Sequence, residues 1–287
     1  GLGSENKNLP AFCVLLSRGR GNGQGVYTKL WSNGFLDSVH QGVQFSSSEE
    51  RVLYLKDPAG RDRESTRKML DQLAQLNSIN YKEFGDPEIE AKVQQYEMAY
   101  RMQTAVPELS DLTQEPDHII KMYGADCLSP GTYASNCLLA RKLSESGVRF
   151  VQLYHQGWDQ HDNMVGDMPL QAQDVDRATA ALVMDLKQRG LLEETLVIWG
   201  GEFGRTNYCQ GDLKKNNYGR DHHPRNYTIW MAGGGVRPGM VYGQTDDFGY
   251  NIVKDPVHVN DFHATILHLL GLNHEQLTFK HLGRRYR

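Results

Sequence analysis

Short apolar runs and glycine-rich stretches divide the first part of the chain. Residues 11–16 (AFCVLL) form a continuous apolar run between Pro10 and Ser17, which is typical of a fully buried strand. Residues 19–60 are rich in Gly and Ser and keep no sustained period. We interpret them as a long loop region that lies over the domain.

A helical period follows and continues to about residue 146. Apolar residues recur every three or four positions, first at 69, 73 and 76 and then at 89, 93, 96 and 100. Ser129 and Pro130 predict the cap and the first turn of a third helix, and Gly147 follows its end. We therefore expect residues 61–146 to be helical. They form either an inserted cap or a layer that covers one face of a sheet.

After Gly147 the pattern alternates between strands and helices. The predicted strands are 148–154, 195–199 and 227–232, and the predicted helices cover about 175–186 and 261–270. This order predicts an α/β fold with a mostly parallel sheet that is covered on both faces. We expect residues 1–287 to form a single domain.

Composition and charge exclude several classes of protein. The chain of 287 residues has 31 Lys and Arg against 35 Asp and Glu, a net charge of −4, which argues against nucleic-acid binding. No apolar run approaches the ~20 residues that a membrane span needs. The cysteines form no CxxC pair: Cys13 and Cys137 fit the core, and Cys209 lies in a polar loop.

Polar clusters lie beside the predicted strands at residues 155–163, 200–206 and 219–224. The first two follow strands directly, and in open α/β sheets ligands bind outside the carboxyl ends of the strands. We therefore expect these two clusters to share one edge of the sheet. The third cluster joins them if its strand runs antiparallel or if its loop folds back over that edge.

Imidazole and carboxylate groups dominate these clusters. Asp159, His161, Glu202 and His222 could together hold Zn²⁺, Mn²⁺ or a related divalent cation such as Mg²⁺ or Ca²⁺. Arg205 offers a planar group for contact with an anion. Each residue also has a simpler interpretation, because Asp-x-His occurs in ordinary surface loops and an acidic residue is favoured near a helix N-terminus.

Long motifs in the same regions resemble one known family. They are GWDQHDN, LVIWGGEFGRT, GRDHHP, IWMAGGGVRPGMVYGQTDDFG and DFHATILHLLGLNHEQLTF. They are similar to the sulfatase-like domain-of-unknown-function family 1501, in the alkaline phosphatase-like superfamily. The resemblance implies a three-layer α/β/α sandwich and a metal-dependent hydrolase of sulfate or phosphate esters. It places the metal ligands on Asp159, His161, Glu202, Asp221 and His222.

The resemblance leaves one ligand pair open and implies further features. Superfamily members use an aspartate and a histidine four residues apart, so His155 with Asp159 is the alternative pair. The nucleophile is expected upstream of Gly1, and without it we expect weak turnover or none. Export and a small-molecule or carbohydrate ester substrate are implied as well. The alternative function is a non-catalytic module of this fold that binds a sulfated or phosphorylated polymer or a protein partner.

Overall fold

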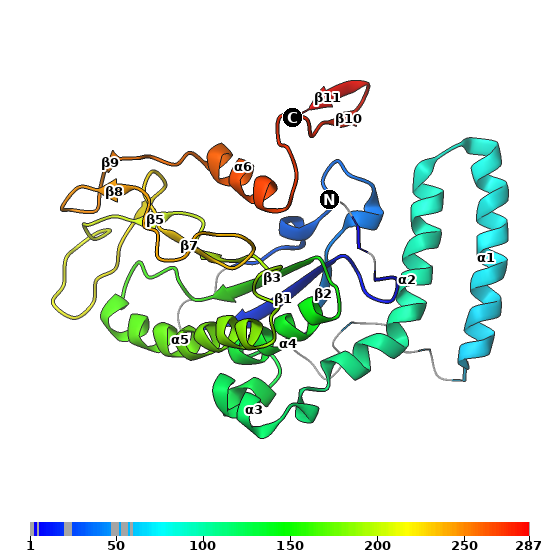
Figure 1. Ribbon diagram of the computed structural model, residues 1–287, viewed down its shortest axis with the longest axis horizontal. Helices are drawn as coiled ribbons and strands as arrows, with labels where there is room; N and C mark the ends of the chain where they lie inside the picture. Colours follow the sequence, from blue (N-terminus) through cyan, green and yellow to red (C-terminus); the bar gives the residue numbers. More distant parts are fainter. Residues whose placement is uncertain are drawn as a thin grey trace.

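A small parallel sheet lies at the centre of the computed structural model, in the strand order β2-β1-β3 (Figure 1). Its strands are β1 (Phe12–Arg18), β2 (Val43–Phe45) and β3 (Phe150–Gln156). The structure describes residues 3–4, 6–19, 25–46, 52, 57 and 60–286. Within these residues the chain is a mixed α/β structure, as the alternating pattern predicts.

The predicted strands at 11–16 and 148–154 are confirmed as β1 and β3, which pair in parallel from Phe12 opposite Phe150 to Arg18 opposite Gln156. The predicted loop region contains more structure than expected. It includes β2 and the 3₁₀ helices η1 (Thr28–Trp31) and η2 (Ser38–His40). A three-residue strand is too short to give a recognisable alternation of apolar and polar residues.

Helices α4 (Tyr133–Glu145) and α5 (Met164–Gln188) pack against each other and bury the core beside β1 and β3. The short elements η3 (Leu112–Gln114), α3 (Asp117–Tyr123) and η4 (Ala125–Leu128) complete this layer. The start of α4 differs from the prediction. Thr132, rather than Ser129, caps it by accepting a hydrogen bond from the Ser135 amide, and the preceding Gly131 has a positive φ of 86°.

A buried ion-pair network joins α4 to α5. The Arg141 side chain is 1 % exposed, and its Nε lies 2.9 Å from Oδ2 of Asp185, which is also 1 % exposed. Arg141 also pairs with Glu115, and Arg189 Nε lies 2.7 Å from Asp185 Oδ1. The buried charges are thus paired on several sides, as a low-dielectric interior requires.

Helices α1 (Arg63–Phe84) and α2 (Pro87–Ser110) form a hairpin that extends from the rest of the molecule (Figure 1). Asp62 and Asp86 cap their N-termini, and Gly85 takes the left-handed conformation in the turn between them. Helix α1 packs on α2, whereas α2 also contacts η2 and α4. The helical region at 61–146 therefore has two parts: an extended hairpin and helices that cover the sheet.

The strands β4 (Val197–Gly200) and β7 (Ile229–Ala232) form a separate antiparallel pair. The expectation of a mostly parallel sheet is therefore wrong for this half of the fold. The link from β4 to β7 contains no helix, only β5 (Gly204–Arg205), β6 (His222–His223) and loops. Without a crossover helix, the chain returns beside β4 in the opposite direction.

The C-terminal part is an open arrangement of short elements. The hairpin β8 (Gln244–Thr245) and β9 (Ile252–Lys254) is followed by α6 (Val259–Leu269) and a second hairpin, β10 (Phe279–His281) and β11 (Arg284–Tyr286). A capping box fixes the start of α6, but the helix has no buried residue. In the part of the chain described, no helix has the length and apolar character needed to cross a bilayer.

Candidate metal centre

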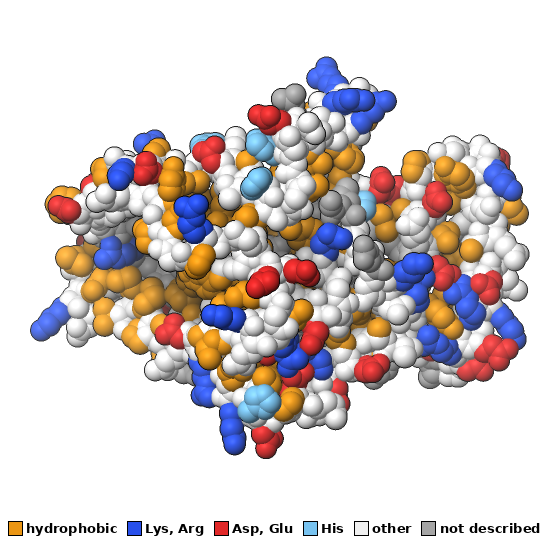
Figure 2. Space-filling view, viewed as in Figure 1, with side chains coloured by type: hydrophobic (Ala, Val, Ile, Leu, Met, Phe, Trp, Pro, Cys, Tyr) orange, Lys and Arg blue, Asp and Glu red, His pale blue; other side chains and the backbone are white. Residues whose placement is uncertain are grey.

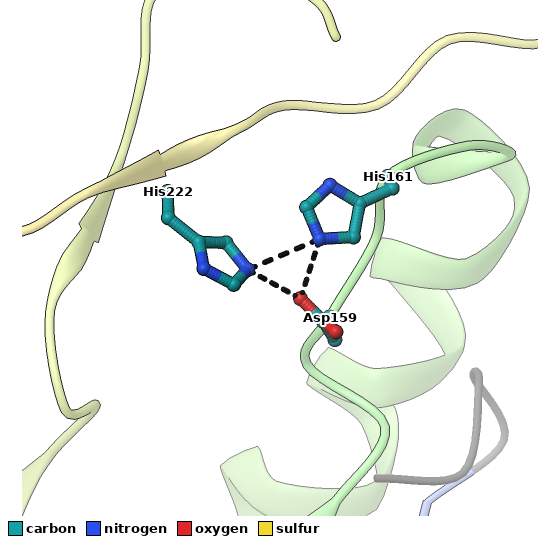
Figure 3. A group of neighbouring side chains, drawn as sticks. All are labelled: Asp159, His161 and His222. Atoms are coloured by element: carbon teal, nitrogen blue, oxygen red, sulfur yellow. Dashed lines mark hydrogen bonds and ion pairs between the residues drawn. The ribbon is translucent and has the colours of Figure 1, made fainter.

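Three side chains from two distant segments meet at one point (Figure 3). Asp159 Oδ1, His161 Nε2 and His222 Nε2 each lie 3.0 Å from the other two. Asp159 and His161 come from the loop between β3 and α5, and His222 comes from β6. Across the described residues, this is the one group of three or more acidic, histidine or cysteine side chains whose ligand atoms converge in this way.

Backbone contacts hold the two segments together. The Arg220 amide donates to the Gln160 carbonyl at 3.0 Å, and the Met164 amide donates to the Tyr218 carbonyl at 3.0 Å. Between these two bonds, Gly219 lies directly against the backbone of residues 160–161. A Cβ atom at this position would be 2.1 Å from the His161 carbonyl carbon. Only glycine allows this approach, which brings His222 to His161.

Arg205 holds the aspartate. Its Nη2 donates to Asp159 Oδ1 at 2.7 Å and to the Trp158 carbonyl at 3.0 Å. Burial would raise the pKa of Asp159, but hydrogen bonds from His222 and Arg205 and the positive charge of Arg205 together lower it below its usual value. The predicted anion-binding arginine therefore contacts a side chain of the protein and keeps that side chain ionised.

The remaining predicted ligands lie outside the converging group. Glu202 is exposed, and its carboxylate is not among the atoms that converge within the described residues. Asp221 accepts a hydrogen bond from the His222 amide at 2.7 Å through Oδ1, and its own amide donates to Thr206 Oγ1 at 3.0 Å. Asp221 thus fixes the backbone of the histidine strand, and its role as a ligand stays a prediction, like that of Glu202.

His155, the alternative partner of Asp159, is not in the converging group found among the described residues. His155 Nδ1 lies 2.9 Å from Ser17 Oγ on β1, and its ring meets the Tyr133 ring edge-on at 5.0 Å. Burial lowers the pKa of His155, although the charge of Asp174 acts in the opposite direction. His155 therefore belongs to a half-buried cluster at the end of the parallel sheet.

The donor set suits a divalent cation. Two imidazole nitrogens and one carboxylate oxygen are ligands that Zn²⁺ accepts, and atoms this close together can all contact one ion at about 2.0–2.2 Å. Two Nε2 lone pairs 3.0 Å apart repel each other unless positive charge lies between them. A proton supplies such charge at one pair of atoms, whereas a cation supplies it to all three.

The sequence predicted these three residues as candidate ligands and Arg205 as an anion contact, but it gave neither Arg205 nor Gly219 a role in positioning the candidate ligands. The contact of Arg205 with Asp159 spans 46 positions and has no local pattern. The role of Gly219 could have been predicted, because a glycine directly before a run of candidate ligands often indicates that two backbone segments lie very close together.

Comparison with known proteins gave one match. A family model described as "Protein of unknown function (DUF1501)" matches residues 1–287. No curated protein and no solved structure matches the chain.

Proposed function

This chain belongs to the DUF1501 family of proteins of unknown function, and from its site we propose that it is a metal-dependent hydrolase of sulfate or phosphate esters. The observation that carries the proposal is the convergence of Asp159, His161 and His222, with ligand atoms 3.0 Å apart. An isolated Asp-x-His pair would be weak support for a metal site, because it occurs in ordinary surface loops. The third side chain lies 61 positions from His161, so its proximity results from the fold and not from the local sequence.

The residues have separate roles in this proposal. Asp159, His161 and His222 hold the cation, which when bound polarises an ester oxygen and lowers the pKa of a water ligand to about 7. Arg205 orients Asp159 and keeps its carboxylate ionised, so that the ligand stays negatively charged in weak acid. Phe203 packs its ring on His222 at 4.8 Å between ring centres and limits the rotation of that imidazole.

The finer fold assignment belongs to the same proposal. A parallel sheet with helices α4 and α5 on one side, and α6 beyond the other, is compatible with a three-layer sandwich of the alkaline phosphatase-like kind (Figure 1). The site lies after the carboxyl end of β3, where α/β folds place their ligands.

Metal analysis tests the proposal directly. The chelator-treated protein is dialysed separately against Zn²⁺, Mn²⁺, Mg²⁺ and Ca²⁺, and bound metal is measured by mass spectrometry together with the melting temperature. We expect about one ion per chain and a higher melting temperature for at least one metal. His222→Ala removes a ligand and abolishes both effects, whereas the control His274→Ala, at an exposed position, preserves them. Trace metal and no stabilisation would refute the proposal.

An activity assay separates the enzyme from the binding module. Aryl sulfate and aryl phosphate are offered to the longest natural polypeptide that contains residues 1–287. Turnover that is lost in Asp159→Ala and kept in His274→Ala supports the hydrolase. Metal binding without turnover of either ester supports the non-catalytic module.

A further inference from the structure

The hairpin of β10 and β11 projects from the rest of the molecule beyond α6 (Figure 1). Residues 276–287 contain four Lys and Arg and no Asp or Glu, although the whole chain has a net charge of −4. Figure 2 shows Lys and Arg side chains grouped on this projection, at the top of the view. The hairpin is therefore a positively charged element on a protein that is acidic as a whole.

Two of these cations lie directly opposite each other. In the antiparallel register Lys280 pairs with Arg285, and side chains in such a position have Cβ atoms about 4.5–5.5 Å apart. Like charges directly opposite each other are destabilising. Both residues are exposed, and within the described part of the chain neither has an acidic partner. The fold leaves this repulsion uncompensated, and an external anion between the two cations would remove it.

The aromatic residues of the hairpin orient this pair. Successive side chains of a strand point to opposite faces, so Phe279 and Tyr286 share the face opposite to that of Lys280 and Arg285. The Phe279 ring contacts the Phe35 ring, with 5.1 Å between their centres. The aromatic face is therefore anchored on the segment between η1 and η2, and the cationic face points away from that segment.

The turn of the hairpin presents a leucine to solvent. Leu282 and Gly283 connect the two strands, and both have a positive φ, of 46° and 80°. Asn or Asp followed by Gly is preferred in a turn of this kind, because other residues rarely adopt a positive φ. Leu282 is also 88 % exposed. A leucine here adds backbone strain without burying its side chain in the protein, whereas an apolar environment outside the protein would bury it.

We propose that the β10–β11 hairpin is a peripheral membrane-binding element that recognises anionic phospholipids. Leu282 enters the boundary between headgroups and acyl chains, and Lys280 and Arg285 lie on the lipid phosphates. Arg284, which is exposed next to the turn, adds a third cation. Tyr286 is 48 % exposed, and tyrosine is favoured at the membrane–water interface. This role is separate from that of the metal centre.

A bilayer fits these features better than a soluble polyanion does. The pair Lys280 and Arg285 could bind either, since both offer phosphate or sulfate groups. An apolar side chain at the turn gains nothing from a sulfated or phosphorylated polymer. The interface of an anionic bilayer, in contrast, takes up apolar and cationic groups side by side. Since one leucine and a few cations form a small contact, the attachment is reversible.

Vesicle sedimentation tests the proposal. The protein is mixed with vesicles of phosphatidylcholine alone and with vesicles in which about one third of the lipid is phosphatidylglycerol. We expect binding to the anionic vesicles only, and weaker binding as the salt concentration rises. Lys280→Gln/Arg285→Gln should lower the affinity about 30-fold, since each cation contributes about 5-fold near an anionic surface. The matched control Lys214→Gln/Lys215→Gln removes the same charge from an exposed loop and should bind as the unmodified protein does.

A second variant tests the apolar contact and spares the fold. Leu282→Asn places a residue that accepts a positive φ at the turn, so the melting temperature should stay unchanged or rise. We expect its affinity for the anionic vesicles to fall about 10-fold, because the burial of a leucine side chain is lost. His222→Ala, which removes a candidate metal ligand, should bind vesicles as the unmodified protein does.

Three results would overturn the proposal. Failure of the unmodified protein to bind anionic vesicles would exclude the membrane as its partner. Equal affinities of Lys280→Gln/Arg285→Gln and its control would place the contact elsewhere on the surface. If Leu282→Asn binds the vesicles as tightly as the unmodified protein, and dextran sulfate competes with them, the hairpin recognises charge alone and its partner is a soluble polyanion.

Discussion

Gly219 offers the sharpest test of the site geometry, because a single methyl group should separate the two segments that carry the candidate ligands. In Gly219→Ala the new Cβ would lie 2.1 Å from the His161 carbonyl carbon and 2.2 Å from the Gln160 carbonyl oxygen. Both neighbours are backbone atoms, so no side-chain rotation can relieve the steric clash. The φ angle of Gly219 is not in the left-handed region, so steric contact is the effect being tested.

The size of the effect follows from these distances. Real Cβ contacts are essentially never below 3.0 Å, so the segments must part by at least 0.9 Å. Metal ligands tolerate displacements of about 0.2 Å. His222 follows Gly219 by three residues and would move with it, so we expect metal affinity to fall by at least about 10–100-fold. The forced contact should also cost about 1–3 kcal/mol of unfolding free energy.

The assay is a metal titration followed by calorimetry, together with thermal unfolding of the metal-free protein. Gly201→Ala is the matched control, because a Cβ there meets only the Phe203 carbonyl oxygen, at an ordinary 3.5 Å. We expect the control to bind metal as the unmodified protein does. Unchanged metal affinity and unchanged melting temperature in Gly219→Ala would refute the geometry described for this site.

Other predictions concern the core, the aspartate and the thiols. Arg141→Met should lower the unfolding free energy by about 3–5 kcal/mol in urea denaturation, because it leaves buried carboxylates without a partner; a loss below about 1 kcal/mol would contradict this. The lowered pKa of Asp159 contributes stability that is present above its unfolded pKa and is lost as pH falls through its folded pKa. Arg205→Gln should therefore move this acid loss to higher pH in NMR titration of the carboxyl carbon, and an unmoved titration would exclude the contact. Burial raises the pKa of Cys137 to about 12, so a thiol reagent at pH 8 should modify Cys209 in the native protein and leave Cys137 unmodified until the chain unfolds.

Local patterns predicted the five longer helices and four of the strands, but not α3, the 3₁₀ helices or the shorter strands. The apolar runs that became β1, β3, β4 and β7 were long enough to recognise, and the glycine after α5 marked its end. The strand β2 was missed because three residues carry no period. The start of α4 was placed too early because Thr132, Ser129 and Pro130 are all acceptable near a helix start, and the positive φ of Gly131 decides between them.

Long-range geometry could not be predicted from the sequence in the same way. An apolar run indicates that a strand is buried but not the direction in which it runs. The sequence therefore did not determine that β7 pairs with β4 in the antiparallel direction. The direction of β7 and the fold of the preceding loop decide whether His222 reaches Asp159. The interpretation of Arg205 changed for the same reason, because the nearby anion proved to be a carboxylate of the protein itself.

The wide spacing of the three converging residues has a consequence for how the protein acquires its folded state. Asp159 and His222 are separated by 63 positions, and α5, β4 and the intervening loops must all be in place before they meet. Contacts between remote positions form slowly, since loop closure must precede any energetic gain. We therefore expect the triad to assemble late during refolding, so that an imidazole signal from His222 would report completion of the native structure rather than early collapse.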